Sequence, residues 1–136
     1  MIDKEIIKIA SNTENHGMLN DHTHSSKLKN AICGDEMKIY LIIRDDKIMD
    51  FRYECESCIY CQASVSLLSR SAKNKSIEKV KSFAKQAKNC FEIKAKSFDK
   101  EWKEFDKIMT KNNISRKECL LLPINTTLDA LNKKSL

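Results

Sequence analysis

The feature that most constrains the fold is a segment in which apolar and polar residues alternate, followed by a tight turn and a second extended segment. The alternating apolar residues are Met37, Ile39, Leu41 and Ile43. A period of two puts them on one face of a β-strand. Asp45 and Asp46 then favour a turn, and residues 47–53 return as a second strand. We therefore predict a β-hairpin with one buried face, which leads directly into a cluster of cysteines at residues 55–61.

Most of the remaining chain has the apolar spacing of amphipathic helices. Helices are predicted over residues 2–10, over residues 61–72 and after an N-cap at Ser76. A further apolar stripe, interpreted as core packing, consists of Phe98, Trp102, Phe105 and Met109. Pro123 is expected in the first turn of a last helix that ends near Asn132, because the missing N–H of proline is not needed there.

Two polar segments, residues 11–32 and 110–118, are predicted to be a long surface loop and a connector. The order of elements is then a hairpin followed by helices. It predicts an α+β fold in which a small antiparallel sheet, the hairpin with room for an extra strand, packs against several helices. With 136 residues, the whole chain (1–136) is expected to be a single domain.

Composition bounds the cellular setting. No segment approaches the ~20 consecutive apolar residues of a membrane span, and the acidic start of the sequence is unlike a signal peptide. We expect a cytoplasmic protein with no membrane partner, whose six cysteines stay reduced and favour metal or redox chemistry.

The net charge is +6, and much of the lysine lies in residues 73–107, interleaved with acids as on solvated helix faces. Nucleic-acid binding is the alternative, but no recognised motif accompanies these lysines.

Three cysteines from separate segments form the candidate metal site. Cys33 opens the sequence Cys33-Gly34-Asp35, in which glycine lets the thiol and the carboxylate approach one ion. Cys58 lies just before a predicted helix, and Cys119 is far downstream. With Asp35 they make a Cys₃Asp set, which suits tetrahedral zinc or an iron–sulphur cluster. The carboxylate binds more weakly than a thiolate, so it can leave and open a coordination position.

The other thiols and the histidines leave alternatives open. Residues 55–61 hold three cysteines with the C-x₂-C-x₂-C spacing of a ferredoxin, but the fourth cysteine before a proline is missing. Cys61 is therefore only an accessory candidate, and Cys90 stands alone near the end of a helix. His22 and His24 could bind a metal together, but they lie in the polar loop, where we expect them to be solvated.

The surroundings of Cys119 should favour its thiolate. Arg116 and Lys117 supply positive charge, and a position near the start of the last helix would add the helix dipole. The alternative is a thiol that packs with the three leucines of residues 120–122.

These segments resemble the scaffold family of iron–sulphur cluster assembly that includes the N-terminal domain of NifU, IscU and SufU. Residues 30–35 look like the family's N-P-x-C-G-D, and Cys58 with residues 63–66 looks like its G-C-x(4)-A-S-x-S. Residues 116–123 are similar to R-x-K-C-x-L-x-W, and residues 127–131 to the T-L-x-x-A-L helix that follows. Order and spacing agree over nearly the whole chain.

The SufU branch is suggested by spacing. Sixty residues separate Cys58 from Cys119, similar to SufU and longer than in IscU, and the L-P-P-V-K motif of IscU is absent before Cys119. The resemblance implies zinc held by Cys33, Asp35, Cys58 and Cys119, and sulphur accepted from a cysteine desulfurase with Cys33 as persulfide acceptor. Arg116 matches the arginine of this branch and is a second accessory residue.

The chain departs from the family pattern at several positions near the site. Glu118 replaces the basic residue that usually precedes the last cysteine, and Ile124 replaces the usual tryptophan. Cys55 and Cys61 stand where the pattern has Gly and Ser, so the site has thiols that the family does not require.

The resulting hypothesis is an iron–sulphur cluster assembly protein, a zinc-dependent sulphur acceptor that works with a cysteine desulfurase and passes sulphur toward an iron–sulphur carrier or apo-protein. Such a protein could be classed as a sulfurtransferase. One alternative is a scaffold that assembles a [2Fe–2S] cluster, or binds iron, on the same ligands. An alternative of another class is a structural zinc domain that binds nucleic acid through its lysine-rich helices, which steep salt dependence would reveal.

Overall fold

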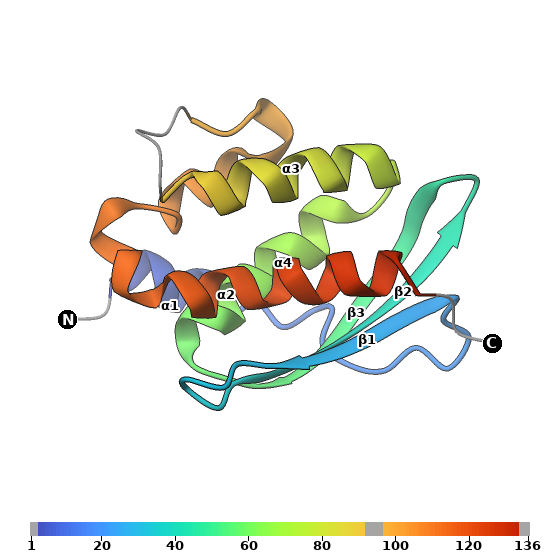
Figure 1. Ribbon diagram of the computed structural model, residues 1–136, viewed down its shortest axis with the longest axis horizontal. Helices are drawn as coiled ribbons and strands as arrows, with labels where there is room; N and C mark the ends of the chain where they lie inside the picture. Colours follow the sequence, from blue (N-terminus) through green and yellow to red (C-terminus); the bar gives the residue numbers. More distant parts are fainter. Residues whose placement is uncertain (1–2, 92–96, 134–136) are drawn as a thin grey trace.

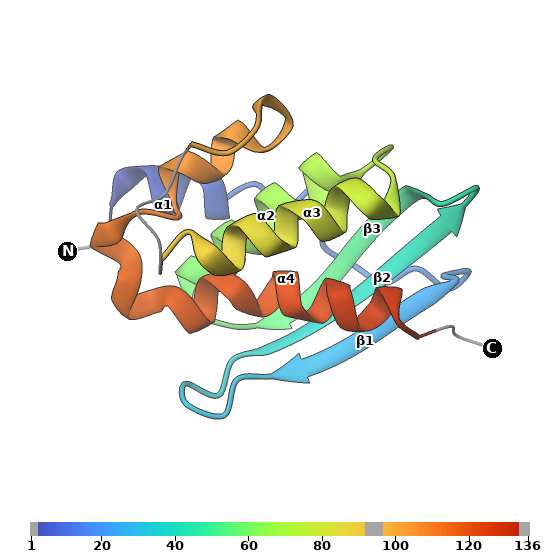
Figure 2. The ribbon, with the colours of Figure 1, turned by 45° about the horizontal axis from the view of Figure 1, so that its top comes forward.

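The computed structural model describes residues 3–91 and 97–133. Within these ranges, three antiparallel strands form a sheet in the order β1 (His24–Lys29), β2 (Glu36–Arg44) and β3 (Lys47–Glu56). The helices cover one face of this sheet (Figures 1 and 2). They are α1 (Lys4–Ala10), α2 (Ile59–Ala72), α3 (Ile77–Asn89), α4 (Lys117–Leu131) and the 3₁₀ helices η1 (Lys100–Lys107) and η2 (Lys111–Arg116). The predicted α+β fold is confirmed.

The hairpin of β2 and β3 forms as predicted. Asp45 and Asp46 have φ angles of 52° and 60°, which is the left-handed turn that matches the twist of two antiparallel strands. The inward-facing Met37, Ile39 and Leu41 are fully buried. Ile43 is only half-buried, because the register shifts between Ile42 and Ile43.

The prediction that residues 11–32 form a loop is wrong for its last part. β1 pairs with β2 in antiparallel register and supplies the extra strand for which the sequence left room. Alternation was not visible because the inward-facing Ser26 is polar. Its hydroxyl donates a hydrogen bond to the Asp129 carboxylate of α4, so a buried polar contact replaces an apolar one.

The predicted helices are present, and the aromatic stripe is core. Ser76 caps α3, where its Oγ accepts a hydrogen bond from the Lys79 N–H at 3.2 Å. Phe83 stacks on Trp102 at 4.2 Å between ring centroids. Only Trp102 and Phe105 of the stripe lie on the 3₁₀ helix η1, which has a break in helical geometry at Trp102, although the spacing of the stripe resembles that of an α-helix. The predicted helix over residues 2–10 corresponds to α1, and residue 2 lies outside the described residues.

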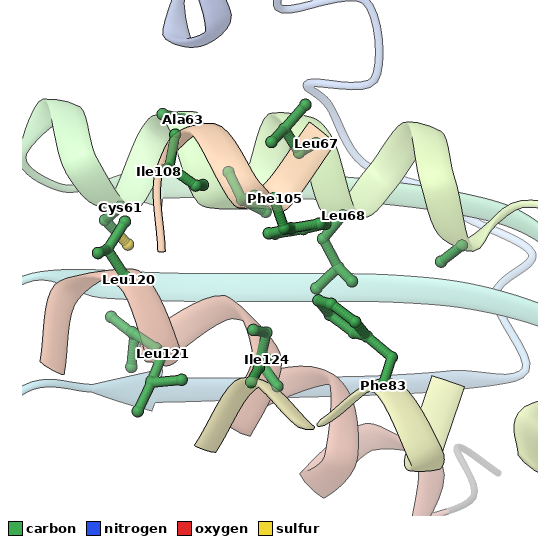
Figure 3. Packing of buried hydrophobic residues seen from close by; sticks show 14 of the residues in the cluster. Cys61, Ala63, Leu67, Leu68, Phe83, Phe105, Ile108, Leu120, Leu121 and Ile124 are labelled. Carbon is green, nitrogen blue, oxygen red and sulfur yellow. The ribbon is translucent and has the colours of Figure 1, made fainter. Parts of the chain in front are cut away.

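The predicted start of the last helix is wrong. α4 begins at Lys117, so Pro123 lies inside it, and residues 110–118 are η2 and the first turn of α4 instead of a connector. Pro123 cannot donate a helical hydrogen bond to the carbonyl of Cys119. The helix continues because its apolar residues are buried against α2, α3 and the sheet, and Figure 3 shows Leu120, Leu121 and Ile124 in this core.

Packing of the helices on the sheet places the start of two of them at one end of the molecule. α2 contacts β3, and α4 contacts β1 and β2. In Figures 1 and 2 the β1–β2 loop and the first turns of α2 and α4 meet at the same end of the sheet. In the described part of the chain, no helix is both long enough and apolar enough to cross a membrane.

Candidate metal centre

The β1–β2 loop carries Cys33 and Asp35. The Asn30 carbonyl accepts a hydrogen bond from the Gly34 N–H at 2.8 Å, and the Asn30 N–H donates to the Asp35 carbonyl at 2.7 Å. Gly34 has a φ of 77°, a left-handed conformation that glycine adopts without strain. The loop is therefore a closed turn that presents the thiol and the carboxylate on the same side, as the Cys33-Gly34-Asp35 sequence predicted.

Three of the four predicted ligands come together. One ligand atom from each of Cys33, Asp35 and Cys119 lies within 4.8 Å of the other two. The Sγ atoms of Cys33 and Cys119 are 3.7 Å apart, although 86 positions separate these residues in the sequence. Cys33 is exposed, whereas Asp35 and Cys119 are buried. The group thus has one solvent-facing thiol and two ligands held inside.

Cys58, the fourth predicted ligand, lies next to this group, although its thiol is not one of the three ligand atoms within 4.8 Å of one another. It is the N-cap residue of α2, and its backbone N–H donates a hydrogen bond of 3.1 Å to Asp35 Oδ1. Its side chain interacts with the Cys119 thiol, whose pKa it raises. Cys58 therefore orients Asp35 and contacts Cys119, with its thiol at the edge of the candidate site.

The expectation that basic neighbours favour the Cys119 thiolate is wrong for the metal-free protein. Burial raises the pKa of Cys119, and the nearby thiols of Cys58 and Cys33 raise it further. The Arg116 guanidinium lies over the ring of Tyr60, 5.2 Å from its centroid, on the exposed surface. Sequence reasoning missed Tyr60 as the partner of Arg116, since no pattern links the two helix starts that carry them.

The donor set fits a metal ion. Asp35 Oδ2 is buried and has no hydrogen-bond partner, which is costly for a carboxylate unless a cation approaches it. Zn–S bonds of about 2.3 Å put two sulphurs of a tetrahedral site about 3.8 Å apart, close to the 3.7 Å between Cys33 and Cys119. Two thiols and a carboxylate suit zinc or iron better than hard ions such as magnesium.

The other candidates lie outside this group of ligand atoms. Cys61 is fully buried in the core, next to Leu120 in Figure 3, and burial raises its pKa. Cys90 is half-buried at the end of α3, and burial raises its pKa to about 11. His22 Nδ1 is 2.6 Å from the Leu19 carbonyl, and His24 Nδ1 is 2.9 Å from the Thr23 hydroxyl, so both rings make contacts within their own segment.

Fold and site together define a class of protein: a small α+β fold in which the β1–β2 loop and the start of α4 bring two thiols and a carboxylate to one end of a three-stranded sheet. The chain belongs to the NifU-like N terminal domain family, which matches residues 1–95.

Individual relatives agree with this assignment. The chain is 29% identical to the iron–sulphur cluster assembly scaffold protein IscU of Thermotoga maritima over 135 residues, 99% of this chain and 95% of that protein. It is 32% identical to the zinc-dependent sulfurtransferase SufU of Bacillus subtilis over 74 residues, 54% of this chain and 50% of that protein. The crystal structure of an N-terminal NifU-like protein from Brucella abortus has the same fold, with a TM-score of 0.89 at 20% identity, and covers 96% of this chain and 91% of that one.

Proposed function

We propose that this chain acts in iron–sulphur cluster assembly as a zinc-dependent sulphur acceptor for a cysteine desulfurase. The observation that carries the proposal is the Cys33–Asp35–Cys119 group, with one exposed thiol, one buried thiol and a buried carboxylate oxygen that lacks a partner. The names of the IscU and SufU relatives support the assembly role and the zinc-dependent transfer role respectively. The family membership supports both.

Cys33 is the acceptor in this proposal, because it is the exposed thiol of the group. The Cys33 thiolate attacks the outer sulphur of the desulfurase persulfide, and the S–S bond of that persulfide breaks. The desulfurase cysteine leaves as a thiolate, and Cys33 then carries the sulphur as a persulfide. Asp35 and Cys119, both buried, stay in place while Cys33 reacts. Zinc, when bound, keeps the thiols deprotonated and is not itself oxidised or reduced.

A scaffold for a [2Fe–2S] cluster on the same residues is the second candidate. It is favoured by the Thermotoga maritima IscU relative, which matches almost the full length of this chain. Both functions use the same ligand set, since thiolates bind zinc and iron–sulphur clusters alike. The metal that accompanies the purified protein therefore separates them.

Native mass spectrometry of protein purified without oxygen tests the proposal, before and after desulfurase and cysteine are added. We expect one zinc per chain and one added sulphur on Cys33. Cys33→Ser should abolish sulphur loading and stimulation of the desulfurase, whereas Cys90→Ser, a control at a half-buried thiol outside the candidate site, should leave both unchanged. Bound iron and sulfide in place of zinc would establish the scaffold. If the protein binds no metal and takes up no sulphur, both functions are refuted.

A further inference from the structure

Two thiols beside the candidate metal centre have no part in the proposed function. Cys55 is the penultimate residue of β3, and Cys61 lies in the first turn of α2, after a connection of only residues 57–58. Cys55 is opposite Met37 in the β2–β3 register. Met37 is fully buried, so Cys55 faces the helical layer. Both thiols pack on the same hydrophobic core, Cys61 completely and Cys55 in part.

These two thiols and the hydroxyl between them form one cluster. Burial raises the pKa of Cys55 and of Cys61. The Ser57 hydroxyl, which is buried and makes no hydrogen bond of normal geometry to the described residues, opposes the rise at both. A charge on Cys55 raises the pKa of Cys61 further. The charges of Asp35 and Cys58 act on both thiols in the same direction. The cluster of Cys55, Ser57 and Cys61, here called the thiol cluster, therefore adjoins the residues of the candidate metal centre.

Cys55 is the thiol of the cluster that lies nearer the surface, where it is half-buried. Cys55 lines two adjacent pockets of about 250 and 160 Å³, and His16 lines both of them. Neither pocket is lined by Cys33, Asp35 or Cys119. Cys61 is 0% exposed, whereas Cys55 is half-buried. One thiol of the cluster is thus reachable from outside, and the other is protected.

We propose that Cys55 and Cys61 are a dithiol that reduces sulphur accepted at the candidate metal centre to sulfide. This inference rests on the proposed function. A persulfide carries sulphur at the oxidation level of the element, whereas the sulphur of an iron–sulphur cluster is sulfide, so two electrons are needed for each atom. Oxidation of two thiols to one disulfide supplies two electrons, and no external reductant takes part in that turnover.

The reaction balances in two thiol exchanges. First, Cys55 attacks the outer sulphur of a persulfide at the centre, the S–S bond breaks, and the centre's cysteine leaves and takes the proton of Cys55. Cys55 then carries the persulfide. Second, Cys61 attacks Cys55 Sγ, the new S–S bond breaks, and hydrosulfide leaves and takes the proton of Cys61. One persulfide and two thiols become one thiol, one disulfide between Cys55 and Cys61, and hydrogen sulfide.

A single-turnover experiment on the zinc-loaded full chain tests the proposal. Protein is loaded with sulphur by desulfurase and cysteine without oxygen, separated from both, and followed by mass, by a sulfide assay and by differential alkylation with peptide mapping. We expect release of up to one sulfide per chain without added thiol, together with a Cys55–Cys61 disulfide. Cys55→Ser and Cys61→Ala should each lower the sulfide release at least tenfold. Cys90→Ser, which removes a half-buried thiol at the end of α3, should leave the release unchanged.

Two results would refute the proposal that Cys55 and Cys61 are the reductant. One is a persulfide that persists in the wild-type protein while both thiols stay reduced, and the other is sulfide release that leaves both thiols free. If no sulphur is loaded, the proposed function has failed, and the thiol cluster is tested separately with inorganic polysulfide as the donor and with the thiol oxidant diamide. Formation of a Cys55–Cys61 disulfide in either treatment would still support the proposal that these two thiols act together. Absence of the disulfide with both polysulfide and diamide would refute that proposal. The mapping in wild-type protein decides the question even where a variant does not fold.

Discussion

Replacement of Asp35 separates the role of a metal ligand from that of a structural residue. Asp35 Oδ1 accepts the Cys58 N–H at 3.1 Å, and Oδ2 is buried without a partner. Asp35→Asn keeps an acceptor for that N–H and removes a buried charge. A hydrogen bond to a charged group contributes about 1.5–3 kcal/mol and one to a neutral group about 0.5–1.5 kcal/mol. Because burial of the charge has its own cost, we expect the free energy of unfolding of the metal-free protein to change by less than about 1 kcal/mol.

The same substitution should have a larger effect when zinc is present. Loss of the carboxylate ligand is expected to weaken zinc binding by a factor of ten or more, since even changes in groups that support ligands weaken binding by about 10–100-fold. At a fixed excess of zinc, a tenfold weaker affinity removes about 1.4 kcal/mol of the stabilisation by zinc. Urea denaturation with and without zinc measures this difference, and chelator competition measures the affinity directly.

Asp45→Asn is the matched control, because it makes the same chemical change at the tip of the β2–β3 hairpin, where asparagine also tolerates the left-handed conformation. It should leave the stabilisation by zinc unchanged. Equal stabilisation in Asp35→Asn and wild type would show that Asp35 is not a ligand. A loss of more than about 3 kcal/mol in the metal-free protein would assign Asp35 a structural role instead.

Three further predictions concern the fold that supports the site. Burial and the hydrogen bond to Glu54 raise the pKa of Tyr40 to about 12. Since this folded-state pKa is above the ordinary value, the associated stability is present below about pH 10 and is lost as pH rises toward 12. Ultraviolet titration should show a tyrosine that ionises near pH 12, and Glu54→Gln should lower the pKa of Tyr40, whereas an unchanged titration would contradict the contact. Ser26→Ala removes the hydroxyl that donates to Asp129, and should cost about 1–3 kcal/mol in urea denaturation; a cost near zero would mean that this contact does not hold β1 to α4. Phe83→Ala empties the centre of the aromatic cluster, and should cost about 3–5 kcal/mol; thermal unfolding that is unchanged would contradict the packing in Figure 3.

Local patterns were sufficient where a residue's environment is set by its near neighbours. The alternation of residues 37–43 predicted β2, and two aspartates in succession predicted the turn that follows. Ser76 was recognised as a helix cap because capping depends only on residues within one turn. β1 was missed because its register is set by β2 and the partner of its inward-facing Ser26 lies on α4, both distant in sequence.

The site shows the same division. Cys33, Gly34 and Asp35 form a local turn, so the placement of the thiol and the carboxylate on the same side could be predicted from these three residues alone. The approach of Cys119 has no local signal. The sequence named it as a ligand only through the Cys₃Asp set and the family resemblance, because the 3.7 Å between its sulphur and that of Cys33 depends on how α4 packs on β1 and β2. The start of α4 was also misplaced, since proline statistics favour the first turn, whereas burial of the helix in the core allowed Pro123 inside it.

The sequence by itself determined the hairpin, most of the helices, the apolar faces and the kinds of ligand, because these follow from periodicity, turn chemistry and residue type. Only the tertiary structure decided which thiols share one site. It brought ligand atoms of Cys33, Asp35 and Cys119 within 4.8 Å of one another, left Cys58 at the edge, and kept Cys55 and Cys61 outside this group. The physical reason is that a thiol's partners depend on which helix start packs against which strand end, and that packing is a property of the whole core.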